Sequence, residues 1–98
     1  MNVVKTQNGS ELLMEIEGGI DTTTAPELNE ILSNSLDNID SLILDFKKVD
    51  YISSAGLRVL LTAQKKMNVQ GSMKIINANE IVCEIFEVTG FSDILTIE

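Results

Sequence analysis

Strand-like and helix-like segments alternate along this chain with only short links between them, and this alternation limits the folds that it can adopt. The apolar run 42–46 is followed by helical spacing at 54–70, and the run 73–76 is followed by helical spacing at 80–89. Repeated strand–helix–strand units with short connections form right-handed crossovers between parallel strands. We therefore expect an α/β fold with a mostly parallel sheet packed by helices.

The start of the chain has the pattern of a β-hairpin. Asn8-Gly9 separates the segment 3–7 from the alternating apolar residues of 12–16, and Asn-Gly favours the positive φ angles of a type I′ turn. The first strand should then run against all the others, which makes the sheet mixed. With a last strand expected at 94–97, the predicted order is ββαβαβαβ.

The predicted helices carry start signals typical of helix amino termini. Thr24 and Glu27 have the spacing of a capping box before the first helix. Ser53 or Ser54 caps the second helix and Asn79 caps the third. Apolar residues recur every three or four positions in these segments, so each helix is expected to bury one face against the sheet.

The strand expected at 42–46 differs from the hairpin strands because its apolar run is unbroken. Leu42-Ile43-Leu44 is followed closely by Phe46. Such a run is typical of a parallel strand that is covered on both sides. We therefore expect this strand to be central, with its two faces buried.

Composition narrows the class of protein. The 98 residues, 44% of them apolar, suffice for a single domain over 1–98. The formal charge of −8 disfavours nucleic acid and anionic lipid as partners. The absence of histidine removes imidazole bases and the usual zinc sites, so neither a cofactor nor a metal is expected. One cysteine, no leader pattern and no membrane-spanning apolar run indicate a cytoplasmic protein without direct membrane insertion.

Two adjacent serines mark the most informative loop. Ser53 and Ser54 lie between a predicted strand and a predicted helix, where open α/β sheets place ligands. A helix amino terminus favours an added anion, so Ser54 is a candidate phosphate acceptor. Local spacing alone favours two serines that only cap the helix. Arg58, one turn later, is a candidate contact residue because a cation there does not favour the helix dipole, whereas Asp21 is typical of a turn.

Two motifs resemble those of a known family. They are DYISSAGLRVLL at 50–61 and GGIDTTTA at 18–25. The first is similar to the signature of the STAS domain, which occurs in bacterial anti-sigma factor antagonists, and the second to the other characteristic loop of that family. The predicted order of elements also matches the family along essentially the whole chain.

The resemblance implies a binding protein rather than an enzyme. Its unphosphorylated form would bind an anti-sigma factor with serine kinase activity, and so regulate sigma-factor-dependent transcription. Phosphorylation of Ser54 by that kinase would release the partner, and a serine phosphatase would restore binding. The family match implies a contact surface formed by Asp21, Thr22, Thr24, Ser53, Ser54, Gly56 and Arg58.

Two alternatives remain open. Many members of the family have an aspartate where this chain has Ser53, so Ser53 is a second candidate for modification. The family also includes members that are not phosphorylated. The chain would then be a constitutive adaptor subunit of a transporter or signalling complex, with both serines acting only as caps.

Overall fold

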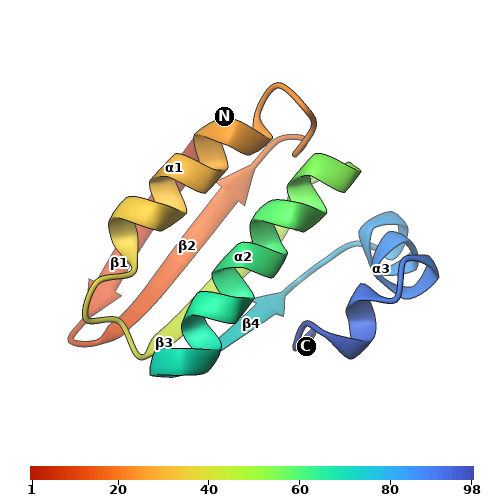
Figure 1. The fold of residues 1–98 in the computed structure, drawn as a ribbon. Helices are drawn as coiled ribbons and strands as arrows, with labels where there is room; N and C mark the ends of the chain where they lie inside the picture. Colours follow the sequence, from red (N-terminus) through yellow and green to blue (C-terminus); the bar gives the residue numbers. More distant parts are fainter.

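In the computed structural model, residues 1–98 form four strands and three α-helices in the order ββαβαβα (Figure 1). A short 3-10 helix, η1, follows the last α-helix. The element bounds are β1 Asn2–Asn8, β2 Glu11–Glu17, α1 Ala25–Ser35, β3 Ser41–Lys48, α2 Ser54–Gln70, β4 Ser72–Ile76, α3 Glu80–Val88 and η1 Phe91–Asp93.

The sheet has the strand order β1-β2-β3-β4. β1 pairs antiparallel with β2, while β2, β3 and β4 are parallel neighbours, which confirms the predicted mixed sheet and the orientation of the first strand. The predicted turn type is wrong. Asn8 belongs to β1 and the loop residues are Gly9 and Ser10, of which only Gly9 has a positive φ, 62°. Glycine at the first of two loop positions is the pattern of a type II′ turn.

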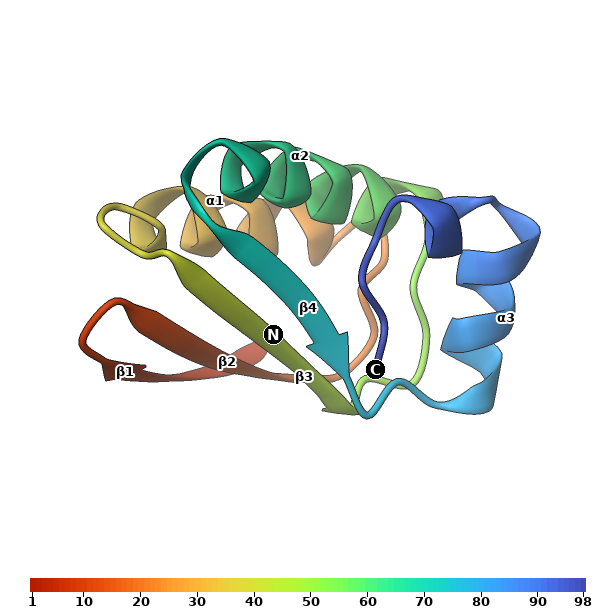
Figure 2. The same cartoon turned by 90° about the horizontal axis from the view of Figure 1, so that it is seen from below.

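Both long helices cover the same face of the sheet (Figure 2). The β2–α1–β3 and β3–α2–β4 crossovers step across the sheet in one direction, and two right-handed crossovers of that kind place their helices on one side. The expectation that 42–46 is covered on both sides is therefore wrong. Leu42, Leu44 and Phe46 are buried under the helices, whereas Ile43 on the opposite face is only half-buried.

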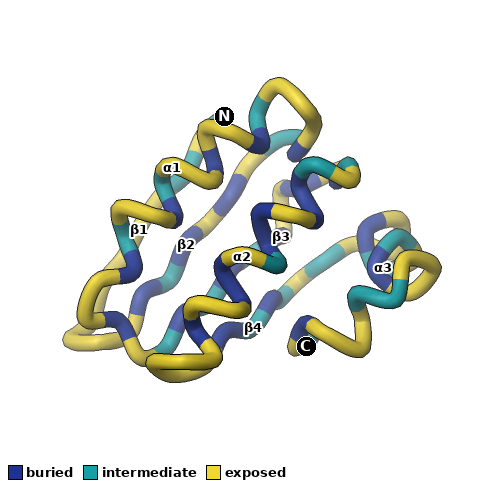
Figure 3. Tube along the Cα trace, viewed as in Figure 1, coloured by how far each residue is buried: buried dark blue, intermediate teal, exposed yellow.

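The core lies between this helical layer and the sheet. In Figure 3 the buried segments of α1 and α2 alternate with exposed ones along each helix, as the periodicity of their apolar residues predicts. α3 lies apart from this layer, at the end of the sheet (Figure 2). It joins the core through Phe86, whose ring centroid is 6.3 Å from that of Phe46.

The predicted last strand is not formed. Gly90 adopts a left-handed φ of 82° and ends α3, after which Phe91–Asp93 form η1. Of the segment 94–97, only Ile97 bridges β4, in a single parallel pairing with Ile75. Leu95 packs into the core, so the apolar character of the segment reflects burial of one side chain rather than a continuous strand.

Candidate functional site

The two motifs that suggested the family lie side by side at the carboxyl end of the sheet. Ile20 and Ile52 form an isolated parallel bridge. The Ile20 N–H donates to the Tyr51 carbonyl at 2.9 Å, and the Ser53 N–H donates to the Ile20 carbonyl at 2.8 Å. The loop before α1 and the loop before α2 are thus one continuous piece of backbone structure.

The two serines have different structural roles. Ser53 is the N-cap of α2, half-buried, and its Oγ accepts the Gly56 N–H at 3.4 Å. Ser54 is the first residue of α2 and its side chain is exposed. A hydroxyl in this position has no capping function to lose, and it lies where the helix dipole favours a negative charge.

Gly56 is a predicted member of the contact surface, but it is buried beneath that surface. A Cβ at this position would lie 2.6 Å from Ile20 Cγ2 and 2.7 Å from Ile52 Cγ1. Both distances are far shorter than van der Waals contact between carbon atoms. The absence of a side chain at Gly56 therefore lets α2 pack directly against both loops.

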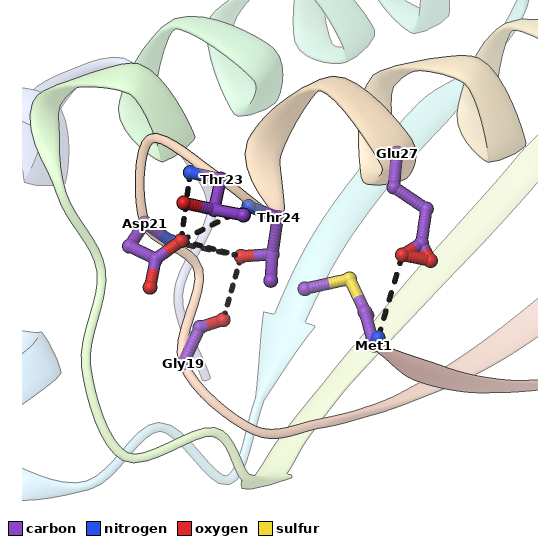
Figure 4. Close-up of polar contacts among 6 residues, drawn as sticks. All are labelled: Met1, Gly19, Asp21, Thr23, Thr24 and Glu27. Atoms are coloured by element: carbon purple, nitrogen blue, oxygen red, sulfur yellow. Dashed lines mark hydrogen bonds and ion pairs between the residues drawn. The ribbon is translucent and has the colours of Figure 1, made fainter.

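Asp21 organises the loop before α1 (Figure 4). Its Oδ1 accepts the N–H groups of Thr23 at 2.8 Å and Thr24 at 2.9 Å. In return Thr24 Oγ1 accepts the Asp21 N–H at 2.9 Å and donates to the Gly19 carbonyl at 2.8 Å. The hydrogen bond from the Thr24 N–H, followed by that from Thr23, lowers the pKa of Asp21 below its ordinary value.

This reciprocal pair is a capping box that lies one turn before the predicted one. Thr24 is the N-cap residue of α1 but makes no side-chain hydrogen bond to the helix. Glu27 instead lies 3.3 Å from the amino group of Met1 (Figure 4). The Thr24–Glu27 box is therefore wrong, and Asp21 has the turn role that its local sequence indicated.

A groove runs between the starts of α1 and α2, beside Ser54. Its volume is about 310 Å³, and it is lined by Thr22, Ala25, Pro26, Asn29, Ala55, Arg58, Val59 and Thr62. Thr22 and Arg58, both predicted as contact residues, are exposed on its two sides. Asn29 and Thr62 are not among the predicted residues, although Thr62 lies one helical turn beyond Arg58 and this spacing places both on one face.

The exposed side of α2 is positively charged. Arg58, Lys65 and Lys66 are exposed, and no acidic residue occurs between Ser54 and Gln70. None of these cations forms an ion pair within the chain. In a protein with a formal charge of −8, this helix is a local positive surface available to an acidic partner.

Neither a membrane-spanning helix nor a cluster of metal ligands is found in the structure. None of the helices combines the length and the apolar character that a membrane span requires. Nor do three or more histidine, cysteine, aspartate or glutamate side chains gather as they would around a metal ion.

Comparisons with known proteins agree with the fold and extend over nearly the whole chain. Residues 2–98 match the sequence model of a family described as the STAS domain. The anti-sigma-B factor antagonist of Bacillus subtilis (strain 168) is 35% identical over an alignment 98 residues long, which covers 99% of this chain and 90% of that protein.

Solved structures share the architecture. The anti-sigma factor antagonist SpoIIAA in its unphosphorylated form superposes with a TM-score of 0.83 at 14% identity, covering 99% of this chain and 88% of that one. The phosphorylated form of SpoIIAA, a Bacillus cell fate determinant, gives a TM-score of 0.75 at 13% identity, covering 99% and 91%. At these identities the likeness establishes the fold alone.

Proposed function

The chain belongs to the STAS domain family, and on this premise we propose that it is an anti-sigma factor antagonist whose binding is controlled by phosphorylation of Ser54. The observation that carries this proposal is the exposed hydroxyl at the first position of α2, beside a groove formed by both motifs of the family. The protein acts by binding an anti-sigma factor, not by catalysis. The 35% identity with the anti-sigma-B factor antagonist over 99% of this chain supports that partner class.

The unphosphorylated protein presents a groove edged by a cation. Thr22 and Arg58 flank the groove, and Lys65 and Lys66 extend the positive surface along α2. We expect a partner with acidic side chains to bind there, since opposite charges steer association and fix its register. The exposed Ser54 hydroxyl would face that partner directly.

Phosphorylation reverses the charge at this point. A phosphate adds about −1.5 to −2 charges and three strong acceptor oxygens at pH 7. Arg58 lies four residues after Ser54, so the two side chains share one face of α2 and the phosphate offers that guanidinium an internal partner. An acidic partner would then meet a dianion where it had met a cation. We propose that release follows from this local change and not from a rearrangement of the fold.

The folded state should tolerate the modification. Ser54 makes no capping hydrogen bond, whereas Ser53 caps α2, and a negative charge in the first turn stabilises a helix by about 0.3–1 kcal/mol. Ser54→Asp should therefore leave the free energy of unfolding unchanged or slightly higher. The same variant should weaken binding of the anti-sigma factor by at least about tenfold, or 1.4 kcal/mol.

The direct experiment is incubation with the cognate anti-sigma kinase and ATP, followed by mass spectrometry of the peptide that contains both serines. We expect a phosphate on Ser54 and none in Ser54→Ala. Ser53→Ala is the matched control, because it removes the adjacent hydroxyl and should still be labelled. Labelling that persists in Ser54→Ala but disappears in Ser53→Ala would assign the acceptor to Ser53 and overturn our choice of residue.

The adaptor alternative makes a different prediction for the same variant. A constitutive subunit would keep its partner when Ser54→Asp is introduced, because the serine would serve no regulatory purpose. Titration calorimetry with the isolated anti-sigma factor distinguishes the two functions. Equal affinity of the parent and Ser54→Asp proteins would exclude the switch.

A further inference from the structure

α3 has a second apolar stripe that its own fold covers only in part. Val82 and Phe86 point into the core and are fully buried. Next to this buried face, Ile81 is 58% exposed and Val88 is 79% exposed, while Ile85 is half-buried at the edge of the core. These residues have the spacing of a single helical stripe. A shallow groove of about 240 Å³ follows the stripe and is lined by Ile81, Glu84, Ile85, Val88 and Thr89.

One border of this stripe is acidic. Glu80, Glu84 and Glu87 are all exposed, and at about 100° per residue they fall on the same side of the stripe. α3 contains no lysine or arginine. The ion pairs of the chain involve other carboxylates, so these three acids have no cation of their own.

We propose that this stripe and its acidic border, which we call the α3 face, bind a helix of a protein partner whose apolar side chains are bordered by lysine and arginine. Apolar anchors at helical spacing beside a shallow groove suit the packing of a second helix. Basic side chains on one edge of that helix would lie against the three glutamates. The charge would set the direction and side of docking, and the apolar contact would supply most of the affinity.

The charge of the molecule argues against two other occupants. An anionic membrane surface would be repelled by the acidic border and by the net charge of −8. A second copy bound through the same face would add three more glutamates to an interface in which neither α3 carries a lysine or arginine. A basic amphipathic helix satisfies both parts of the surface at once.

The α3 face is separate from the proposed regulatory site. No residue lines both its groove and the groove beside Ser54. α3 also lies at the end of the sheet, outside the layer formed by α1 and α2 (Figure 2). Opposite charges distinguish the two surfaces, since α2 is basic where exposed and α3 is acidic. The protein could therefore hold two partners of opposite charge.

The test uses a fluorescently labelled helical peptide of leucine and lysine, with leucines at helical spacing, and a matched peptide in which every lysine is glutamate. Fluorescence anisotropy with the full chain measures both affinities. We expect the lysine peptide to bind at least about tenfold more tightly than the glutamate peptide. Equal binding of the two peptides would overturn the proposal.

Substitutions then locate the binding. The double substitution Ile81→Ser with Val88→Ser removes the exposed apolar contacts, and Glu84→Lys reverses one charge of the acidic border. Each change should lower the affinity for the lysine peptide by at least about tenfold. Val69→Ser, on α2 at 89% exposure, and Glu30→Lys, exposed on α1, are matched controls and should bind as the parent does. If Glu30→Lys weakened binding as much as Glu84→Lys, the attraction would be non-specific and the α3 face would be ruled out.

Two further measurements test whether the α3 face is independent of Ser54 and whether a different occupant covers it. Ser54→Ala should bind the peptide with unchanged affinity, so the α3 face can hold even if Ser54 is not the phosphate acceptor. Sedimentation should show no dimer of the parent protein that is lost in Val88→Ser. Such a dimer, or binding to vesicles of anionic lipid that the same substitution abolishes, would identify a different occupant and refute the proposal.

Discussion

Gly56→Ala should destabilise the protein although alanine is the better helix former. The new methyl carbon would lie 2.6 Å from Ile20 Cγ2 and 2.7 Å from Ile52 Cγ1, with the Ile20 carbonyl oxygen at 3.1 Å. Ile20 is 0% exposed and Ile52 is 1% exposed, so neither side chain can move into solvent to make room. The clash must be relieved by shifting α2 away from the two loops.

The size of the effect follows from two opposing terms. Overpacking a well-packed core costs about 1–3 kcal/mol, while replacing glycine by alanine in a helix contributes up to about 1 kcal/mol of stability. We expect the balance to be a loss of about 1–2 kcal/mol in the free energy of unfolding. For a domain of this size each kcal/mol lowers the melting temperature by about 4–8 °C.

Urea denaturation followed by circular dichroism measures this loss, and Gly19→Ala is the control. A Cβ at Gly19 would meet only Asp50 Oδ1, at 3.3 Å, and Asp50 is an exposed side chain that can turn away. The φ of Gly19 is not positive, so alanine at this position should be neutral or stabilising by about 0.4–1 kcal/mol. Denaturation midpoints for Gly56→Ala equal to those of the parent would refute the close packing of α2 on the loops.

Three more outcomes follow from single side chains. Asp21→Asn keeps the cap but removes a carboxyl whose pKa is lowered on folding. Relative to this variant, the parent should lose stability only as the pH falls below the ordinary pKa of 3.8, because there the unfolded state binds more protons than the folded state. Urea titrations of both proteins across that pH range would show this difference. Asn79→Ala removes the acceptor of the Val82 N–H at 2.8 Å and should cost about 0.5–2 kcal/mol by the same assay, and an unchanged midpoint would contradict its capping role. Gln64→Met should raise the melting temperature, because the buried Gln64 Oε1 has no hydrogen-bond partner and such a group costs about 1–3 kcal/mol. A melting temperature below that of the parent, measured by calorimetry, would refute this.

Much of the fold could be predicted because it depends on local pattern. The helices α1 and α2 follow the periodicity of their apolar residues, and the caps Ser53 and Asn79 lie where the sequence placed them. The third predicted helix also forms, but it lies at the end of the sheet and leaves Ile81 exposed. The antiparallel hairpin could also be predicted, although its loop is Gly9-Ser10 and not Asn8-Gly9, so the turn that sets its register lies one residue later than the predicted one. Each of these features is determined by residues that are close together in the chain.

The errors concern features that depend on distant parts of the chain. An unbroken run at Leu42-Ile43-Leu44 does not reveal that both crossovers place their helices on one face, which is a property of the strand order. The segment 94–97 has strand-like residues, but the left-handed Gly90 and the turn after it let only Ile97 reach β4. Local propensity cannot encode either arrangement.

At the candidate site the sequence indicated which loops matter but not how their residues divide the work. Three neighbours in one motif have different roles: Ser53 caps α2, Ser54 is exposed and Gly56 is buried. The Asp21 box depends on hydrogen bonds whose geometry the sequence does not reveal. The role of each residue depends on which side of the loop faces the other motif.

The short bridge between Ile20 and Ile52 couples the loop before α1 to the loop before α2. Because the Ile20 and Ser53 amides are held only by each other's loops, their hydrogens should exchange with solvent in one shared fluctuation. The two halves of the proposed contact surface should therefore open together. A partner that contacts both loops would then bind only to molecules in which both are folded.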